Sequence, residues 1–167
     1  MKIHIEDKCA EFISGLGDKV YVVGGYVRNS LCGYTHTDID IAGPIPAQAL
    51  KLPPHTTVTT VNHRMGTAQL IHDGVAYEYT PFRTEVYNPG GEHTPSQVFF
   101  TDSLEADAQR RDFCCNAIYY DVKRDEIIDP LNGVRDAQAK ILRGCNKHVF
   151  ESDGLRLLRL VRLAAEL

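Results

Sequence analysis

Short runs of β-branched and aromatic residues, bounded by Gly and Pro, alternate with a few helical stretches over the first hundred residues. Such runs are typical of strands, because branched side chains pack well on a pleated surface. Strands are predicted at residues 20–23, 37–42, 58–61, 67–72, 75–80 and 98–101. Helices are predicted at residues 5–16 and 26–31, with a short one at 47–51. Asp73-Gly74 separates two of the strands and predicts a hairpin turn there.

The spacing of apolar residues becomes helical after residue 102. Helices are predicted at residues 104–109, 113–119, 132–139 and from 150 to the last residue, with a brief strand at 126–128. One sheet with flanking helices predicts an α+β or α/β fold. We expect residues 1–136 to form one domain and residues 137–167 to begin a second, all-helical one.

Two aspartates with one residue between them, Asp38 and Asp40, follow shortly after the paired glycines Gly24 and Gly25. Residues i and i+2 of a strand point to the same side, so the two carboxylates would be presented together. Mg²⁺ prefers oxygen ligands and binds a few carboxylates together with substrate phosphates. The glycines let the backbone approach a phosphate, and the helix after them adds its positive end. Either motif alone could be ordinary surface, but together they favour a metal-dependent nucleotidyltransferase.

The composition, with 43% hydrophobic and 24% charged residues, is that of a globular protein. No apolar run reaches the length of a membrane span, and the N-terminal residues lack a signal-peptide core. The five cysteines show neither a disulfide framework nor zinc-site spacing, so we expect a reducing cytoplasm. The net charge of −4 argues against extensive duplex binding. A local basic groove could still hold one acceptor terminus, because basic residues gather near the C-terminal end: Lys140, Arg143, Lys147, Arg156, Arg159 and Arg162.

Several segments, in order along the chain, resemble the head of class II tRNA nucleotidyltransferases (CCA-adding enzymes) and bacterial poly(A) polymerases. These segments are Gly24-Gly25-Tyr26-Val27-Arg28, Asp38-Ile39-Asp40-Ile41, Tyr77-Glu78-Tyr79, Arg110-Arg111-Asp112-Phe113 with Asn116-Ala117, Ile128-Asp129-Pro130-Leu131-Asn132-Gly133, and Ser152-Asp153-Gly154-Leu155-Arg156. The resemblance runs from about residue 20 to the last residue. It implies a polymerase-beta-like head, with a mixed sheet flanked by helices, over residues 1–136. Residues 137–167 would begin the helical neck, with the family's body and tail absent.

The resemblance implies a Mg²⁺-dependent transfer of CMP and AMP from CTP and ATP to the 3′ end of tRNA. Asp38 and Asp40 would be catalytic metal ligands, and Glu78 a third carboxylate near the acceptor hydroxyl. Glu78 could equally be a surface residue of an edge strand. An apolar terminal helix would favour association with a second copy of the chain.

The resemblance also implies a set of nucleotide-binding residues. Gly24, Gly25 and Arg28 would contact phosphate, and Arg111 and Asp112 would face the nucleotide. Asp112 would accept from the ribose hydroxyls, supported by Asn116. Asp153 and Arg156 would read the base, while Arg159 and Arg162 would lie toward the triphosphate. Without the resemblance, the same residues have ordinary structural explanations. Arg28 could be a cation on a helix surface, Arg110–Phe113 a helix start held by salt bridges, and the last residues the solvent-facing side of a terminal helix.

Three departures from the family pattern leave other functions open. Asn29 replaces an aspartate, Ser152 replaces an acid, and Glu92-His93-Thr94-Pro95 replaces a basic pair before a proline. A flexible loop at the last position is linked in the family to the change from adding C to adding A. The alternatives are therefore a poly(A) polymerase, a partial C- or A-adding enzyme, and a nucleotide- or RNA-binding module without turnover.

Overall fold

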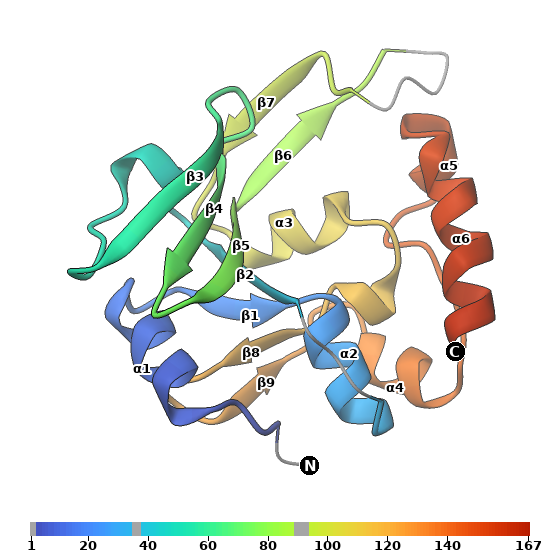
Figure 1. Cartoon of the computed structure of the whole chain (residues 1–167). Coiled ribbons are helices and arrows are strands. Elements are labelled where there is room, and N and C mark those ends of the chain that lie inside the picture. Colours follow the sequence, from blue (N-terminus) through green and yellow to red (C-terminus); the bar gives the residue numbers. More distant parts are fainter. Residues whose placement is uncertain (1–2, 35–37, 89–93) are drawn as a thin grey trace.

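A seven-stranded mixed sheet forms the centre of the computed structural model, which describes residues 3–34, 38–88 and 94–167 (Figure 1). The sheet has the order β3-β4-β5-β2-β1-β8-β9. Its strands are β1 (Tyr21–Val23), β2 (Ile39–Gly43), β3 (Thr56–Asn62), β4 (Thr67–His72), β5 (Val75–Pro81), β8 (Tyr119–Asp121) and β9 (Glu126–Ile128). β2 pairs in parallel with β5, whereas the other neighbouring strands are antiparallel. A small second sheet pairs β6 (Arg83–Val86) with β7 (Gln97–Phe100).

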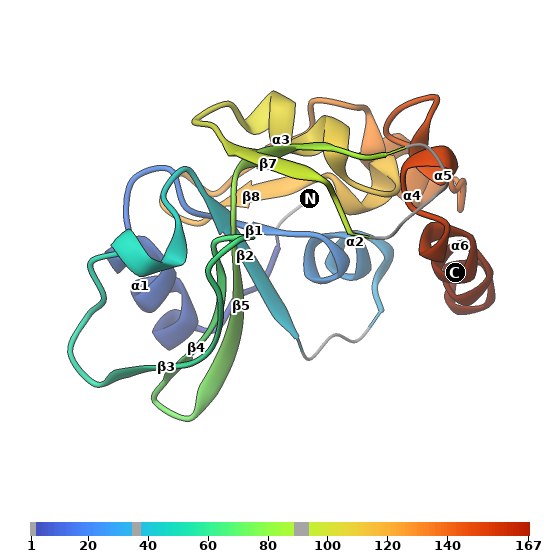
Figure 2. The same cartoon turned by 90° about the horizontal axis from the view of Figure 1, so that it is seen from above.

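Helices cover both faces of the large sheet, because successive residues of each strand point to opposite sides. Val22 of β1 packs in a core cluster with residues of α1 (Asp7–Gly15) and α2 (Gly25–Cys32). Its neighbours in the strand pack in a second cluster with residues of α3 (Leu104–Arg110). α1 and α3 accordingly lie on opposite sides of β1 (Figures 1 and 2).

The remaining helices follow β9 and bring the chain back across the end of the sheet. They are α4 (Gly133–Gln138), α5 (Val149–Ser152) and α6 (Leu155–Glu166), and short 3₁₀ turns lie at Ala47–Ala49 and Cys114–Asn116. α5 and α6 form the edge of the molecule opposite α1 and β3 (Figures 1 and 2). Leu163 of α6 is 1% exposed and belongs to the same core cluster as α1 and α2. The domain boundary near residue 136 stays a prediction. None of the helices in the described ranges is long and apolar enough to cross a membrane.

The predicted α+β fold, with a mixed sheet between helices, is confirmed, and most predicted elements are found within a residue or two of their expected bounds. The helix predicted at 113–119 is wrong. The Cys114 amide donates to the Arg143 carbonyl oxygen (2.8 Å), which pins this segment to the later chain as a single 3₁₀ turn. The tyrosines that follow then pair with β1 as strand β8.

Two further differences affect the site. β6 was not predicted, because its charged residues break the apolar alternation of a strand. The helix predicted from residue 150 is interrupted: Asp153 has extended backbone angles, and its side chain accepts from the Leu155 amide (3.0 Å). An aspartate that bonds the amide two residues later competes with the helix, so α5 ends and α6 begins at this point.

Candidate active site

The turn between β1 and α2 brings the backbone against a carboxylate. Gly24 has φ of +79°, a conformation that side chains disfavour, and α2 begins at the next residue. A Cβ atom on Gly24 would lie 3.2 Å from Oδ2 of Asp40. Gly24 and Asp40 are therefore close neighbours, which brings the glycine motif and the acidic motif together.

Asp38 and Asp40 line one cavity of about 410 Å³, which confirms that the two positions face the same side. Asp38 precedes β2 and is exposed, whereas Asp40 lies within β2 and is half-buried. Burial foremost, together with the charges of Glu78 and Asp38, raises the pKa of Asp40, although Arg111 and Arg159 oppose the shift. Ionised Asp40 is therefore destabilised by burial and by the neighbouring carboxylates. A bound cation would offset that cost.

The described residues contain no group of three or more His, Cys, Asp or Glu side chains that could hold a metal ion. Glu78 pairs in register with Asp40 across β5 and β2, but its side chain is exposed and is not part of the cavity wall. Its Oε1 accepts from Nε2 of Gln69 (2.7 Å). Asp112 and Glu166 also line the cavity, but each is paired with an arginine. Asp38 and Asp40 are the candidate metal ligands, and a Mg²⁺ ion held there would need further oxygens from substrate phosphates.

Arg28 is held by neighbouring polar side chains at the cavity wall. It is 5% exposed, and its Nη1 donates to Oδ1 of Asn116 (2.5 Å). Its Nε and Nη2 both donate to Oδ1 of Asn29 (3.0 and 2.8 Å). The asparagine that replaces the family's aspartate therefore still orients Arg28 toward the cavity.

Asp112 is buried (7% exposed) and connects the sheet side of the cavity to α6. Its Oδ2 accepts from Nε of Arg159 (2.7 Å), and its Oδ1 accepts from the Phe113 amide (2.7 Å) and from Nδ2 of Asn116 (3.3 Å). Burial would raise the pKa of Asp112, but Arg159 and the Phe113 amide lower it below its ordinary value. Asn116 supports Asp112 as the sequence predicts, and the ion pair is formed with Arg159.

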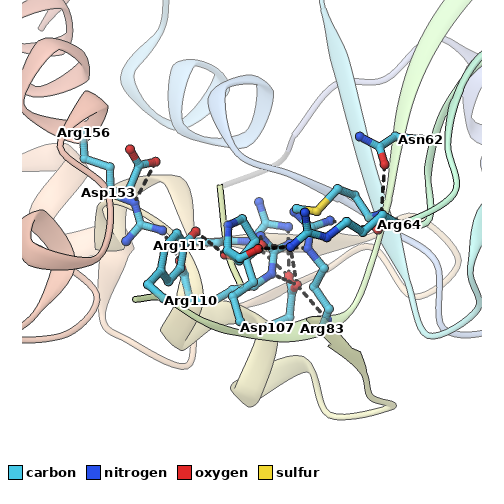
Figure 3. Close-up of polar contacts among 12 residues, drawn as sticks. Asn62, Arg64, Arg83, Asp107, Arg110, Arg111, Asp153 and Arg156 are labelled. Carbon is cyan, nitrogen blue, oxygen red and sulfur yellow. Dashed lines mark hydrogen bonds and ion pairs between the residues drawn. The ribbon is translucent and has the colours of Figure 1, made fainter. Parts of the chain in front are cut away.

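Asp153 and Arg156 lie in an adjoining pocket of about 280 Å³. Arg156 is 6% exposed; its Nη2 donates to the Arg110 carbonyl oxygen (2.8 Å) and its Nη1 to that of Val149 (3.2 Å). Asp153 lies 3.8 Å from Nε of Arg156 (Figure 3). The two residues do not share the one helix predicted from residue 150, because Asp153 precedes α6 and accepts from its first amide, that of Leu155. The two side chains nevertheless lie side by side.

The two pockets form one cleft, since Arg111, Asp112 and Arg159 line both. Arg162 also lines the larger pocket; its side chain is 62% exposed and lies 3.5 Å from Glu166. Carboxylates therefore lie at one end of the cleft, guanidinium groups at its centre, and an acid–base pair at the other end. Such an arrangement can hold a metal, a polyphosphate and a polar heterocycle in a row.

Sequence reasoning gave no role to several residues that line the two pockets. Leu163 and Tyr26 line the larger pocket, and Glu85 and Tyr87 line the smaller one. Oη of Tyr87 donates to Oε2 of Glu85 (2.7 Å), and the guanidinium of Arg156 lies 5.9 Å from the Tyr87 ring centre. A signal was present in the alternation of Arg83, Glu85 and Tyr87, whose side chains share one side of β6 and its extension. Of the Glu92–Pro95 stretch, residues 92 and 93 lie outside the described residues.

Comparison with known proteins gives a consistent result. The sequence profile described as the poly A polymerase head domain matches residues 20–143. The chain is 41% identical over 160 residues to the CCA-adding enzyme of Streptococcus mutans, covering 94% of this chain and 39% of that enzyme. It is 38% identical over 154 residues to the CCA-adding enzyme of Geobacillus kaustophilus, covering 90% of this chain and 37% of that enzyme.

The fold is also similar to a solved structure. The crystal structure of the Bacillus stearothermophilus CCA-adding enzyme in complex with CTP superposes with a TM-score of 0.82 and 34% identity. That match covers 95% of this chain and 38% of the other. The chain thus spans about two-fifths of the length of these relatives. Because the family profile matches most of its residues, the chain belongs to the poly A polymerase head domain family.

Proposed function

We propose that the chain is the nucleotidyltransferase head of a CCA-adding enzyme, which transfers CMP and AMP from CTP and ATP to the 3′ end of tRNA in the cytoplasm. The observation that carries this proposal is the cavity that Asp38 and Asp40 line together with Arg111 and Arg159. The names of the relatives support the addition of CCA, and the CTP complex of the Bacillus stearothermophilus enzyme supports the nucleotide.

Nucleotidyl transfer needs an activated acceptor hydroxyl and neutralisation of the charge on the α-phosphate and the leaving pyrophosphate. Asp38 and Asp40 would hold Mg²⁺, which supplies both effects when bound. Arg111 and Arg159 would contact the phosphates, and the Gly24-Gly25 backbone would leave room for them. Glu78, on the strand beside Asp40, would act at the acceptor side.

The other end of the cleft would choose the nucleotide. Asp112 would accept from the ribose hydroxyls through the lone pairs that Arg159 leaves available. Asp153 would accept from the exocyclic amino group that both C and A carry, and Arg156 would donate to the adjacent ring nitrogen. A wrong base would leave these groups unpaired, which is a costly outcome in a buried site.

The direct test incubates the 167-residue chain with tRNA lacking its 3′ CCA, Mg²⁺ and each labelled triphosphate in turn, and sequences the products. We expect addition of C and then A by the natural chain, and none by Asp40→Ala. Asp18→Ala is the matched control, because Asp18 is exposed and pairs with Lys123 far from the cleft.

Each result separates the proposal from its rivals. Repeated addition of A would identify a poly(A) polymerase, and addition of only C or only A a partial enzyme. Nucleotide binding without any product would identify a binding module. Full activity in Asp40→Ala would overturn the assignment of the cleft.

A further inference from the structure

One carboxylate, Asp107 of α3, connects the two arginines that follow it to the rest of the fold. It is 0% exposed, and the sequence motifs gave it no role. Burial would raise the pKa of Asp107, but Arg111 and Arg110 lower it below its ordinary value, so the group is a buried anion. A buried charge is tolerated only when it is fully paired.

The two oxygens of Asp107 hold different arginines (Figure 3). Oδ1 accepts from Nε of Arg110 (2.7 Å) and from the Arg83 amide (3.3 Å). Oδ2 accepts from Nε and Nη2 of Arg111 (3.0 and 2.9 Å) and from Oη of Tyr119 (2.7 Å). The carboxylate is therefore saturated with donors from α3, β6 and β8.

The remaining donors of Arg111 are left for the cleft. Its Nε and Nη2 are used by Asp107, its guanidinium lies 5.2 Å from the ring centre of Tyr119, and none of the described residues accepts from its Nη1. Arg111 lines both pockets. A planar guanidinium gripped along one edge can present only the other edge, so its direction is fixed before a ligand arrives.

We infer that Asp107 is a positioning residue, which fixes the guanidinium of Arg111 for the triphosphate of the incoming nucleotide. This inference rests on the proposed function. Asp107 and Arg111 can meet because they are four residues apart, and residues i and i+4 lie on the same face of a helix. Tyr119 braces the same oxygen from the sheet, so the position of Arg111 is tied to the strand beside β1.

The experiment compares Asp107→Asn with Asp121→Asn. Asp121 is likewise an almost fully buried aspartate (2% exposed) that holds an arginine, with Oδ2 3.0 Å from Nη1 of Arg124, but it does not line the cleft. Both variants lose a buried charge and should lose stability. Only Asp107→Asn should weaken CTP binding, measured by equilibrium dialysis, on the order of 10- to 100-fold, because a displaced phosphate ligand is costly.

A double-mutant cycle with Arg111→Lys tests whether Asp107 acts through Arg111. Lysine keeps the charge but cannot be gripped along an edge. We expect the double variant to bind CTP no more weakly than the weaker single variant. Additive losses would show that Asp107 acts elsewhere and would overturn the inference.

A second variant covers the case in which Asp107→Asn does not fold. Tyr119→Phe keeps the buried ring but removes the hydroxyl that braces Asp107 and Arg111. It should weaken CTP binding in the same direction while the KM for the tRNA acceptor is unchanged. Equal CTP affinity in Tyr119→Phe, Asp121→Asn and the natural chain would refute positioning. A natural chain that binds no CTP would instead refute the proposed function, and with it any nucleotide role for Arg111.

Discussion

Leu163 should hold α6 in place, and its truncation gives a quantitative test of the cleft. The side chain is 1% exposed, packs in the main core cluster and lines the larger pocket. Arg156 and Leu163 are the buried residues of α6, so Leu163 is the apolar anchor of the helix that carries Arg159 and Arg162. Leu163→Ala should therefore weaken both the fold and the nucleotide site.

The magnitude follows from the burial of the leucine. Replacing a fully buried leucine by alanine costs about 2–5 kcal/mol. For a chain of this size each kcal/mol lowers Tm by about 2–4 °C, so the loss should be about 4–20 °C. The control is Leu158→Ala on the same helix: Leu158 is 68% exposed, and such surface changes stay within about 0.5 kcal/mol.

The assay is thermal unfolding of both variants followed by CTP titration at a temperature where both are folded. We expect a lower Tm and weaker CTP binding for Leu163→Ala, and neither for Leu158→Ala. Equal melting of the two variants would refute the anchoring role. A destabilised Leu163→Ala protein with unchanged CTP affinity would show that the position of α6 is irrelevant to the nucleotide.

Three other substitutions test the cleft at separate points. Asp40→Asn should abolish transfer. It should also raise the free energy of unfolding in Mg²⁺-free buffer at neutral pH, because the raised pKa of Asp40 means that the folded state disfavours its charge. This gain in stability should vanish as the pH falls toward about 3.9, the ordinary pKa of an unfolded aspartate. Gly24→Ala and Gly74→Ala each place a side chain at a positive φ (79° and 80°), so each should lose roughly 1–3 kcal/mol in chemical denaturation. Only Gly24→Ala should lose transfer, since only its Cβ would lie against Asp40. Asp153→Asn keeps an oxygen that can accept from the Leu155 amide, but it adds N–H donors where the base is read. Sequenced products should therefore contain more U and less C and A. Unchanged nucleotide selectivity would exclude Asp153 as a residue that reads the base.

Local patterns predicted the elements that carry the carboxylates and glycines. The β-branched run before Gly24 defines β1, and Asp73-Gly74 makes the predicted hairpin with φ of 49° and 80°. Asp38, directly before β2, and Asp40, within it, line one cavity, as the two-residue repeat of a strand predicts. These features depend on residues close together in sequence, which is why they could be read from it.

The parts that could not be predicted depend on contacts between distant segments. The Cys114 turn is fixed by the Arg143 carbonyl, and Arg156 binds the carbonyls of Val149 and Arg110. Asp107 gathers donors from Arg83 and Tyr119, which no spacing rule connects. Charged residues that are buried against one another look like surface in a hydropathy pattern, so neither the role of Asp107 nor the backbone contacts of Arg156 were predicted.

Because β2 is a central strand and α6 lies at the edge of the molecule, the two ends of the cleft should open locally at different rates. β5 and β1 are hydrogen-bonded along its two edges, so the backbone of Asp40 is released only when the whole sheet opens. Peripheral elements open far more often than central strands, and α6, at the edge of the molecule, has a single buried apolar anchor. Fluctuations that detach α6 would leave Asp40 in place but would withdraw Arg156 and Arg159 from the cleft. On warming, such a protein should lose its affinity for the nucleotide before its carboxylates are displaced.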